Sequence, residues 1–348
     1  MPLMLDQIDD FVATTQTKFK RDKWVDLSHD YPSYVATRLI AERGIEEDGG
    51  RDISWIVNKD TNGNAQPTGI FAQVTINVDD TVATATAPWR FQITGYAYDQ
   101  REKFFQSSRE RVISELKLRD INAQGDMVKL QENLFWGAPS SSSDTNSLWG
   151  VSYWVQADAS TTPNGAFNGG NPTGFSGGAA GIDSTTVTNW RNWTAGYTTP
   201  NTDDLVKKIK RAMVNTEFEA PVPTPELGFS KADRCMYAEY DDVIEPLERL
   251  AETRNQNLGS DLAMYLGEVT IAKVPLKKSF WLQANRTDDP VIGLDFGQFR
   301  PVIQENLNMV RLDPEMVPGQ PHVRRVCRSH AMNWICYNRR RQFIVSKA

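Results

Sequence analysis

One glycine-rich segment has the residue pattern most suggestive of catalysis. Residues 174–178 read GFSGG, which fits the G-x-S-x-G pattern around a serine nucleophile, here Ser176. His322 and His330 follow in the chain order that a hydrolase uses. The pattern needs a strand before the serine and a helix after it, but the flanking residues are mostly Gly, Ala, Asn and Pro. The segment is therefore weak support for a catalytic serine.

Cysteine and histidine side chains near the C-terminus are the other candidates for chemistry. Cys327, His330 and Cys336 lie within ten residues, and His322 could complete a set of four soft ligands. This is not a spacing typical of zinc sites, and side chains that alternate along strands do not converge. Neither G-x-G-x-x-G nor G-x-x-x-x-G-K-[ST] occurs. We therefore predict no catalytic residue, no metal site and no cofactor, and a protein that is not an enzyme.

Length and composition favour a globular protein. The 348 residues predict about two domains, and a hydrophobic content of 40% is enough to build a core. The three cysteines have no C-x-x-C spacing, which indicates reduced thiols rather than a disulfide framework. No apolar run is long enough for a membrane span, and residues 1–6 do not begin a signal peptide. We expect a protein of a cytoplasm-like space with no membrane partner.

Charge is distributed unevenly along the chain. The net charge of −6 argues against a protein whose main task is to coat nucleic acid. From Arg311 to Ala348, however, eight Arg or Lys residues face two acidic ones. Two interpretations are open: these residues face a polyanion or a neighbouring subunit, or they bridge to acidic neighbours within strands. The candidates for the first are Arg324, Arg325, Arg328, Arg339, Arg340 and Arg341.

The elements before these candidates indicate an arm that reaches another surface. Residues 53–57 predict a strand, 61–69 a turn, and 70–78 and 81–94 the returning strands of a long hairpin. In the last run, residues 89, 91 and 93 alternate with 90, 92 and 94, as the two-residue period of a strand requires. An isolated hairpin is marginal in water, so its apolar face needs a partner. That face carries Trp89, Phe91 and Ile93.

A charged helical stretch of about forty residues follows the hairpin, up to Trp136. Apolar residues recur in it at steps of three, four or their multiples, which predicts one apolar stripe on a charged rod about 60 Å long. Gly125 is a candidate position for a kink. The stripe consists of Phe104, Val112, Leu116, Ala123, Met127, Leu130 and Leu134.

The rest of the chain mixes helices with short strands, which favours an α+β fold. We predict an amphipathic segment at 1–20 and helices at 34–40, 205–212 and around 243–250, the last with Pro246 in its first turn. Predicted strands lie at 149–155, 269–275, 323–327, 332–336 and 343–345, and a loop-rich stretch at 285–301.

Four stretches, taken in order, resemble one known family. They are the hairpin exit at 89–96, the long helix, Gly169–Pro172 with Trp190–Asn192, and Pro290–Asp295. In this order they resemble the major capsid proteins of tailed bacteriophages, which have the Hong Kong 97 phage capsid fold. The resemblance covers most of residues 50–348 and depends on the order of the stretches rather than on any one motif.

The resemblance implies an α+β fold in five parts. These are an N-terminal arm at 1–50, an extended β-hairpin loop at 51–96, a peripheral domain with the spine helix at 97–222, an axial domain at 223–311, and C-terminal strands that return to the peripheral domain at 312–348. The hairpin loop reaches across a neighbouring subunit in this family. The predicted contact residues are Trp55, Phe71, Trp89, Phe91 and Ile93.

The function that the resemblance implies is self-assembly. Pentamers and hexamers of the chain would form the icosahedral head of a tailed phage around double-stranded DNA, assembled in the host bacterial cytoplasm and located in the virion. About fifty residues precede the hairpin, too few for a fused scaffold, so a separate scaffolding protein is implied, with a portal as a further partner. A decoration protein is left open. The alternative is a hydrolase or carbohydrate-binding protein that uses the Gly/Ser/Trp-rich loop region.

Overall fold

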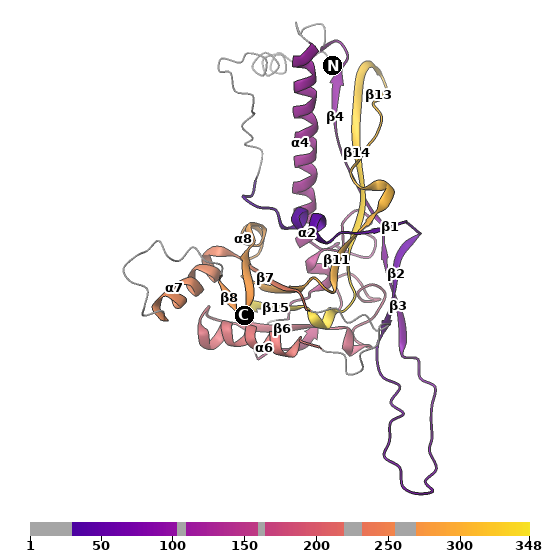
Figure 1. Ribbon diagram of the computed structural model, residues 1–348, viewed down its shortest axis with the longest axis vertical. Helices are drawn as coiled ribbons and strands as arrows, with labels where there is room; N and C mark the ends of the chain where they lie inside the picture. The colour runs from indigo at the N-terminus through magenta and orange to yellow at the C-terminus, as the bar shows by residue number, and fades with distance from the viewer. Residues whose placement is uncertain (1–29, 103–108, 159–163, 219–231, 255–268) are drawn as a thin grey trace.

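A computed structural model describes residues 30–102, 109–158, 164–218, 232–254 and 269–348 (Figure 1). The segment predicted at 1–20 lies outside them. The α-helices are α2 Val35–Arg43, α4 Arg109–Trp136, α5 Val151–Trp154, α6 Lys207–Asn215, α7 Glu245–Arg254 and α8 Phe280–Asn285. Within the described residues no helix combines the length and the apolar character that a bilayer crossing requires.

In the part of the chain that the structure describes, the strands belong to three sheets, so the fold is α+β as predicted. The two-stranded sheet consists of β2 Asp52–Asn58 and β3 Val82–Pro88. The six-stranded sheet consists of β1 Ile45–Glu47, β4 Arg90–Asp99, β11 Phe299–Gln304, β12 Val310–Arg311, β13 Glu315–Val317 and β14 Gln320–Cys336. The seven-stranded sheet consists of β5 Ala166–Gly169, β6 Asn192–Tyr197, β7 Arg234–Ala238, β8 Thr270–Ile271, β9 Val274–Lys278, β10 Val291–Asp295 and β15 Phe343–Lys347.

The six-stranded sheet is organised around the long strand β14. On one side β14 pairs antiparallel with β4 over ten residues of each strand. On its other side it pairs with β11, β12 and β13, and β1 adds to β11 in parallel. Helix α4 packs on β4, where the Thr94 hydroxyl donates to the Ala123 carbonyl at 2.9 Å. The two long strands and α4 extend together away from the rest of the molecule (Figure 1).

A cluster of aromatic side chains joins α4 to both large sheets. Phe135 and Trp136 at the end of α4 are fully buried. The Phe135 ring lies 4.6 Å from that of Trp334 in β14, which stacks on Phe299 of β11 at 5.5 Å. The Trp136 ring lies 5.5 Å from that of Tyr237 in β7 of the other sheet. Burial of such large side chains is the main stabilising contribution at this junction.

Local sequence signals explain why several helices begin where they do. The Asn201 side chain accepts a hydrogen bond from the Asp204 amide at 2.7 Å and caps the π-helical turn Thr202–Val206, which leads into α6. Pro246 is the second residue of α7, which directly follows the π-helical turn Tyr240–Ile244. The helices predicted at 34–40, 205–212 and 243–250 are thereby confirmed.

The predicted hairpin is shorter than expected, and its returning strand is wrong in two places. Residues 70–78 form no strand, because no neighbouring strand pairs with their backbone. The run predicted at 81–94 is divided at Pro88, so that β3 belongs to the hairpin and β4 to the six-stranded sheet. The hairpin is therefore the β2–β3 ladder, which carries a loop of residues 59–81 (Figure 1).

The long helix also begins later than predicted. Residues 97–99 continue β4, and α4 begins at Arg109, so that its 28 residues span about 42 Å rather than 60 Å. The helix runs without a break through Gly125. Ala123 and Met127 of the predicted stripe are buried, whereas Leu130 is exposed and Phe104 lies outside the described residues.

Two further predictions were wrong, each for its own reason. The strand predicted at 149–155 is the single helical turn α5, which buries Val151, Tyr153 and Trp154 together. The loop-rich stretch predicted at 285–301 contains the start of β11 and all of β10, every residue of which is buried. A central strand covered on both faces shows no two-residue period.

The C-terminal strands divide between the two sheets. The strands predicted at 323–327 and 332–336 are parts of β14, whereas β15 lies between β6 and β10 in the seven-stranded sheet. The predicted boundaries at 222/223 and 311/312 therefore do not coincide with the boundaries between the sheets. Segments far apart in sequence pair in the centre of a sheet, and composition does not reveal such pairing.

Two glycine substitutions should change stability in opposite directions. A Cβ at Gly293 of β10 would meet the ring of Phe343, which is buried and cannot move aside, so Gly293→Ala should lower the free energy of unfolding by about 1–3 kcal/mol. A Cβ at Gly125 of α4 meets nothing within 4 Å, so Gly125→Ala should raise it by about 0.5–1 kcal/mol. Chemical denaturation of both variants checks the signs; equal effects would contradict the packing described for β10.

Candidate functional site

The loop of residues 59–81 is attached firmly to the body at its base. The Lys59 amide donates to the Thr81 carbonyl at 2.8 Å, and the Lys59 ammonium pairs with Asp80 at 2.8 Å. The Asn189 side chain donates to the Lys59 carbonyl at 3.1 Å and ties the base to the body. The hydrogen bond from Lys59 lowers the pKa of Asp80. The base therefore fixes the position from which the loop projects.

Beyond the base, side chains rather than a strand ladder hold the two arms of the loop. The Asn64 amide group donates to the Asn77 carbonyl at 2.7 Å and accepts from the Asn77 N–H at 3.0 Å. The Gln66 side chain donates to the Thr75 carbonyl at 3.4 Å. These bridges provide hydrogen-bond partners for some of the backbone N–H and C=O groups, and they leave the apolar side chains exposed to solvent. The exposed ones are Ile70, Phe71, Val74, Ile76 and Val78.

The five predicted contact residues fall into two groups. Trp89 is only 9% exposed and belongs to the chain's own core, and the Trp55 ring packs 6.2 Å from that of Trp154. Trp89 is thus buried within its own chain, which corrects its assignment as a contact with a neighbour. Trp55 is half-buried, and its contact with a neighbour stays a prediction. Phe71, Phe91 and Ile93 are exposed, and Phe91 and Ile93 keep 64% and 63% of their surface in solvent.

Strand β4 alternates as predicted, but the polar face is the buried one. Arg90 and Gln92 are buried, whereas Phe91 and Ile93 point to solvent. Gln92 accepts a hydrogen bond from Gln131 of α4 at 3.4 Å, and Arg90 donates to the Asp144 carbonyl at 2.8 Å. Because α4 covers the polar face, the opposite face of β4 is left without cover by the helix.

Most of the basic residues near the C-terminus have partners within the subunit. Arg339 is fully buried and donates to the carbonyls of Trp154, Trp190 and Gly170, each at 2.9 Å. Burial lowers its pKa to about 10. Arg341 is buried and pairs with the buried Asp295 at 2.7 Å. These two arginines cannot face DNA, because they hold the subunit's own segments together.

The other four basic residues are more accessible. Arg340 lies over the ring of Phe218 at 4.3 Å, and Arg328 pairs with Asp120 of α4 at 2.7 Å. Arg325 is exposed and pairs with Glu315 at 2.9 Å. The interpretation that these residues bridge to acidic neighbours thus holds for Arg325, Arg328 and Arg341. Arg324 is half-buried in β14.

The residues with catalytic or metal-binding patterns are not brought together. Ser176 lies in an exposed turn, and within the described residues it makes no hydrogen bond to His322 or His330. Cys327 and His330 differ by an odd number of positions in β14 and so lie on opposite faces of the sheet. Cys336 shares a face with His330 but lies six residues away, about 20 Å along the strand. These side chains therefore cannot bind one ion together.

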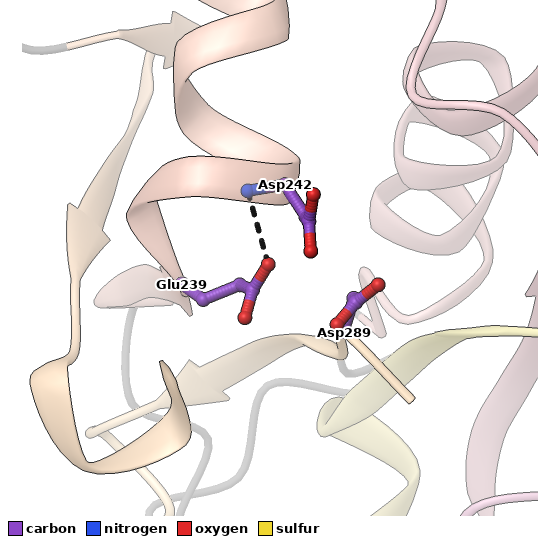
Figure 2. A group of neighbouring side chains, drawn as sticks. All are labelled: Glu239, Asp242 and Asp289. Carbon is purple, nitrogen blue, oxygen red and sulfur yellow. Dashed lines mark hydrogen bonds between the residues drawn. The ribbon is translucent and has the colours of Figure 1, made fainter. Parts of the chain in front are cut away.

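One acidic cluster was missed by the sequence analysis, because its members come from distant segments. Glu239, Asp242 and Asp289 have carboxylate oxygens within 4.8 Å of one another (Figure 2). Glu239 accepts from the Asp242 amide at 3.1 Å and caps the turn Tyr240–Ile244, and Asp289 pairs with Lys347 at 2.5 Å. Burial and the two neighbouring carboxylates raise the pKa of Glu239. Capping and pairing account for this arrangement.

Comparison with known proteins shows which solved structures share this fold. The sequence matches no known family model and no curated protein. The structure is similar to a chain of the capsid asymmetric unit of cyanophage A-1(L), with a TM-score of 0.59 and 14% identity, covering 96% of this chain and 98% of that one. It is also similar to a chain of Mycobacterium phage Bobi, with a TM-score of 0.51 and 12% identity, covering 96% and 97%.

A third similar structure comes from an encapsulin complex. It is a chain of the holo-SrpI encapsulin complex of Synechococcus elongatus PCC 7942, with a TM-score of 0.53 and 11% identity, covering 96% of this chain and 94% of that one. The chain therefore has the phage capsid fold, as the resemblance implied, over nearly its whole length. At these identities the likeness establishes the fold and nothing further.

Trp89 and Phe91 should respond very differently to truncation, although they are two residues apart. Trp89→Ala removes a buried indole and should lower the free energy of unfolding by about 3–5 kcal/mol. Phe91→Ala removes an exposed ring and should change it by less than about 0.5 kcal/mol. Denaturant titration of the unassembled subunit measures both; a large loss in Phe91→Ala would show that this face is covered within the subunit.

His330 should make the subunit less stable in mild acid. Burial lowers its pKa from the usual 6.5 to about 4, and both ring nitrogens lack a hydrogen-bond partner in the described structure. Between these values the unfolded chain binds a proton that the folded chain does not, so stability falls as pH drops from about 6.5 to about 4, by up to about 3 kcal/mol.

In the His330→Gln variant the unfolded chain has no imidazole at position 330 to bind this proton. Unfolding measured at pH 7 and pH 4.5 should then show a smaller acid-induced loss in the variant than in the unsubstituted chain. An equal loss in both would mean that other groups dominate the acid response.

Proposed function

We propose that the chain is the major capsid protein of a tailed phage, a subunit that assembles into pentamers and hexamers of an icosahedral head around double-stranded DNA. The observation that carries the proposal is the loop of residues 59–81, which projects apolar side chains into solvent from a firmly fixed base. Exposed apolar groups of this kind mark interaction surfaces. The fold, shared with a cyanophage capsid chain over nearly the full length, supports the same conclusion.

The parts of the subunit follow from this proposal. The extended loop is residues 51–88, and the peripheral domain combines α2, α4 and the six-stranded sheet. The axial domain is built on the seven-stranded sheet and includes β15. This division changes the boundaries expected from sequence, because both large domains draw on distant segments. The contacts with neighbouring subunits involve Phe71, Phe91 and Ile93, which are exposed.

The remaining partners are proposed on the same basis. Arg324 and Arg325 are the basic residues of the tail best placed to meet DNA or a neighbouring subunit, because β14 exposes its outer half. A separate scaffolding protein and a portal belong to the same proposal, as does location in the virion after assembly in the host cytoplasm. A compartment of the encapsulin kind is the competing function, and the similarity to the encapsulin chain is what favours it. The exposed turn around Ser176 gives no support to a hydrolase.

Assembly is the direct test. The purified chain, alone or co-expressed with a candidate scaffolding protein, should sediment as capsomers or shells and show closed particles in negative-stain images. Shells that protect DNA from nuclease fit a phage head, whereas shells that hold no DNA favour the encapsulin alternative. A strictly monomeric chain under all these conditions contradicts the proposal.

Two loop variants should separate assembly from folding. Phe71→Asp and Val78→Asp each place a charge on a fully exposed apolar position of the loop. Both should abolish shells and leave the melting temperature of the subunit within about 2 °C of the unsubstituted value, because exposed positions contribute little to stability. Gln73→Asp, an equal charge at a polar exposed position of the same loop, is the matched control and should still assemble. Loss of assembly in the control alone would exclude the apolar side chains as the contact.

A further inference from the structure

We infer that residues 72–78 become a β-strand during assembly, by adding to the free edge of β4 in a second copy of the chain. The inference rests on the self-assembly proposed above and goes further, because it names the receiving strand, the backbone groups that pair and the side chains that meet. Addition of an extended segment to an exposed sheet edge is a common mode of recognition.

The segment has the sequence of a strand without the ladder of one. Residues 72–78 read AQVTINV, with apolar side chains at every even position and polar ones at 73, 75 and 77. This is the two-residue period of a half-buried strand. Two residues already direct backbone groups inward, since the Asn77 N–H and the Asn77 and Thr75 carbonyls bond to side chains of the opposite arm. By the alternation of an extended chain, the backbone groups of residues 74, 76 and 78 point outward.

Strand β4 has a free edge to which its odd-numbered residues direct their backbone groups. The Gln100 amide donates to the His322 carbonyl at 2.9 Å, which sets the alternation of the antiparallel ladder with β14. The even residues of β4 therefore bond to β14, and the odd residues direct their N–H and C=O groups away from it. At Ala97 this outward carbonyl accepts from Arg119 of α4 at 3.2 Å. Within the described residues no strand pairs with the outward groups of Phe91, Ile93 and Gly95.

In both segments of the proposed pair, the residues whose backbone groups point outward also carry exposed apolar side chains. The outward-bonding residues of β4 include Phe91 and Ile93, which are the exposed apolar ones. The outward-bonding residues of the loop include Val74, Ile76 and Val78, which are also exposed and apolar. Directly opposed residues of neighbouring strands share a face, so pairing these edges places aromatic and β-branched side chains side by side.

The partner must be a second copy, because the loop cannot reach β4 of its own chain. The β2–β3 ladder, seven residue pairs long, separates the base of the loop from the start of β4. The loop extends from the far end of this ladder, and β4 runs in the opposite direction (Figure 1). An unpaired strand edge next to exposed apolar side chains favours association with another chain. Ile70 and Phe71 form a turn, so the segment available for pairing is residues 72–78, whose seven residues fit within the ten of β4.

Hydrogen exchange on subunits and assembled particles tests the backbone pairing. In the free subunit the amides of Gln92, Thr94 and Tyr96 should already exchange slowly, because they bond to β14. On assembly the amides of Phe91, Ile93 and Gly95 should slow by at least about tenfold, together with alternate amides of residues 72–78. Particles in which the odd-numbered β4 amides exchange as fast as in free subunits would overturn the inference.

Disulfide trapping tests the side-chain pairing. In a Cys327→Ser background, Ile93→Cys is combined with one cysteine at a time at 72, 74, 76 or 78, and with cysteines at 73 or 75 as controls. Opposed residues in a hydrogen-bonded pair have Cα atoms about 5.5 Å apart, which suits a disulfide. Oxidised particles should give cross-linked dimers from at least one even position and from neither control. Cross-links at none of the even positions, or equally at the odd ones, would overturn the pairing.

These outcomes are separable from the test of the proposed function. If the unsubstituted chain forms no particle, the self-assembly proposal fails and this inference fails with it. If particles form but show neither the alternating protection nor the even-position cross-links, only the strand addition is wrong, and the loop contacts its neighbour through side chains alone.

Discussion

The packing of α4 against both large sheets is the interaction on which the rest of the structure depends. Its last turn buries Phe135 and Trp136 between the sheets, and Glu132 accepts hydrogen bonds from the Ala36 amide at 2.8 Å and the Trp136 indole at 2.7 Å. Burial raises the pKa of this carboxyl group despite these bonds. Because α4 occupies one face of the β4–β14 pair, the other face of this pair and the free edge of β4 remain available. The loop of residues 59–81 extends in the opposite direction and does not reach them within its own chain.

The amphipathic helices and the alternation of β4 could be predicted from sequence, because these patterns are local. Which face of β4 is buried could not, because that depends on a helix that follows the strand in the chain. Gln92 is buried against a glutamine of α4, while Phe91 is exposed. The sequence predicted that the apolar face of β4 needs a partner, and the exposure of Phe91 and Ile93 is consistent with that expectation. Exposed apolar residues of this kind mark a candidate interface.

The sequence also could not predict which basic residues are buried and which are exposed. The sequence left open whether the basic residues face a partner or bridge to acidic neighbours. Arg339 does neither, because three carbonyls from distant segments converge on its guanidinium group in the interior. A buried arginine satisfied in this way stabilises one arrangement of the segments, and removing it would leave the carbonyls unpaired. Such convergence arises only from the folded chain. The same is true of β15, whose neighbours β6 and β10 are more than forty residues away.

The loop combines two requirements that oppose each other. A strand sequence with exposed apolar residues promotes assembly, but in a free subunit it also invites uncontrolled pairing with other chains. The Asn64 and Gln66 bridges reduce this risk, since they occupy one edge of the returning arm with polar side chains and leave a single edge open. In the proposed shell every subunit would both give and receive such a contact. Each contact can then be weak, because effective concentration within the lattice multiplies its effect.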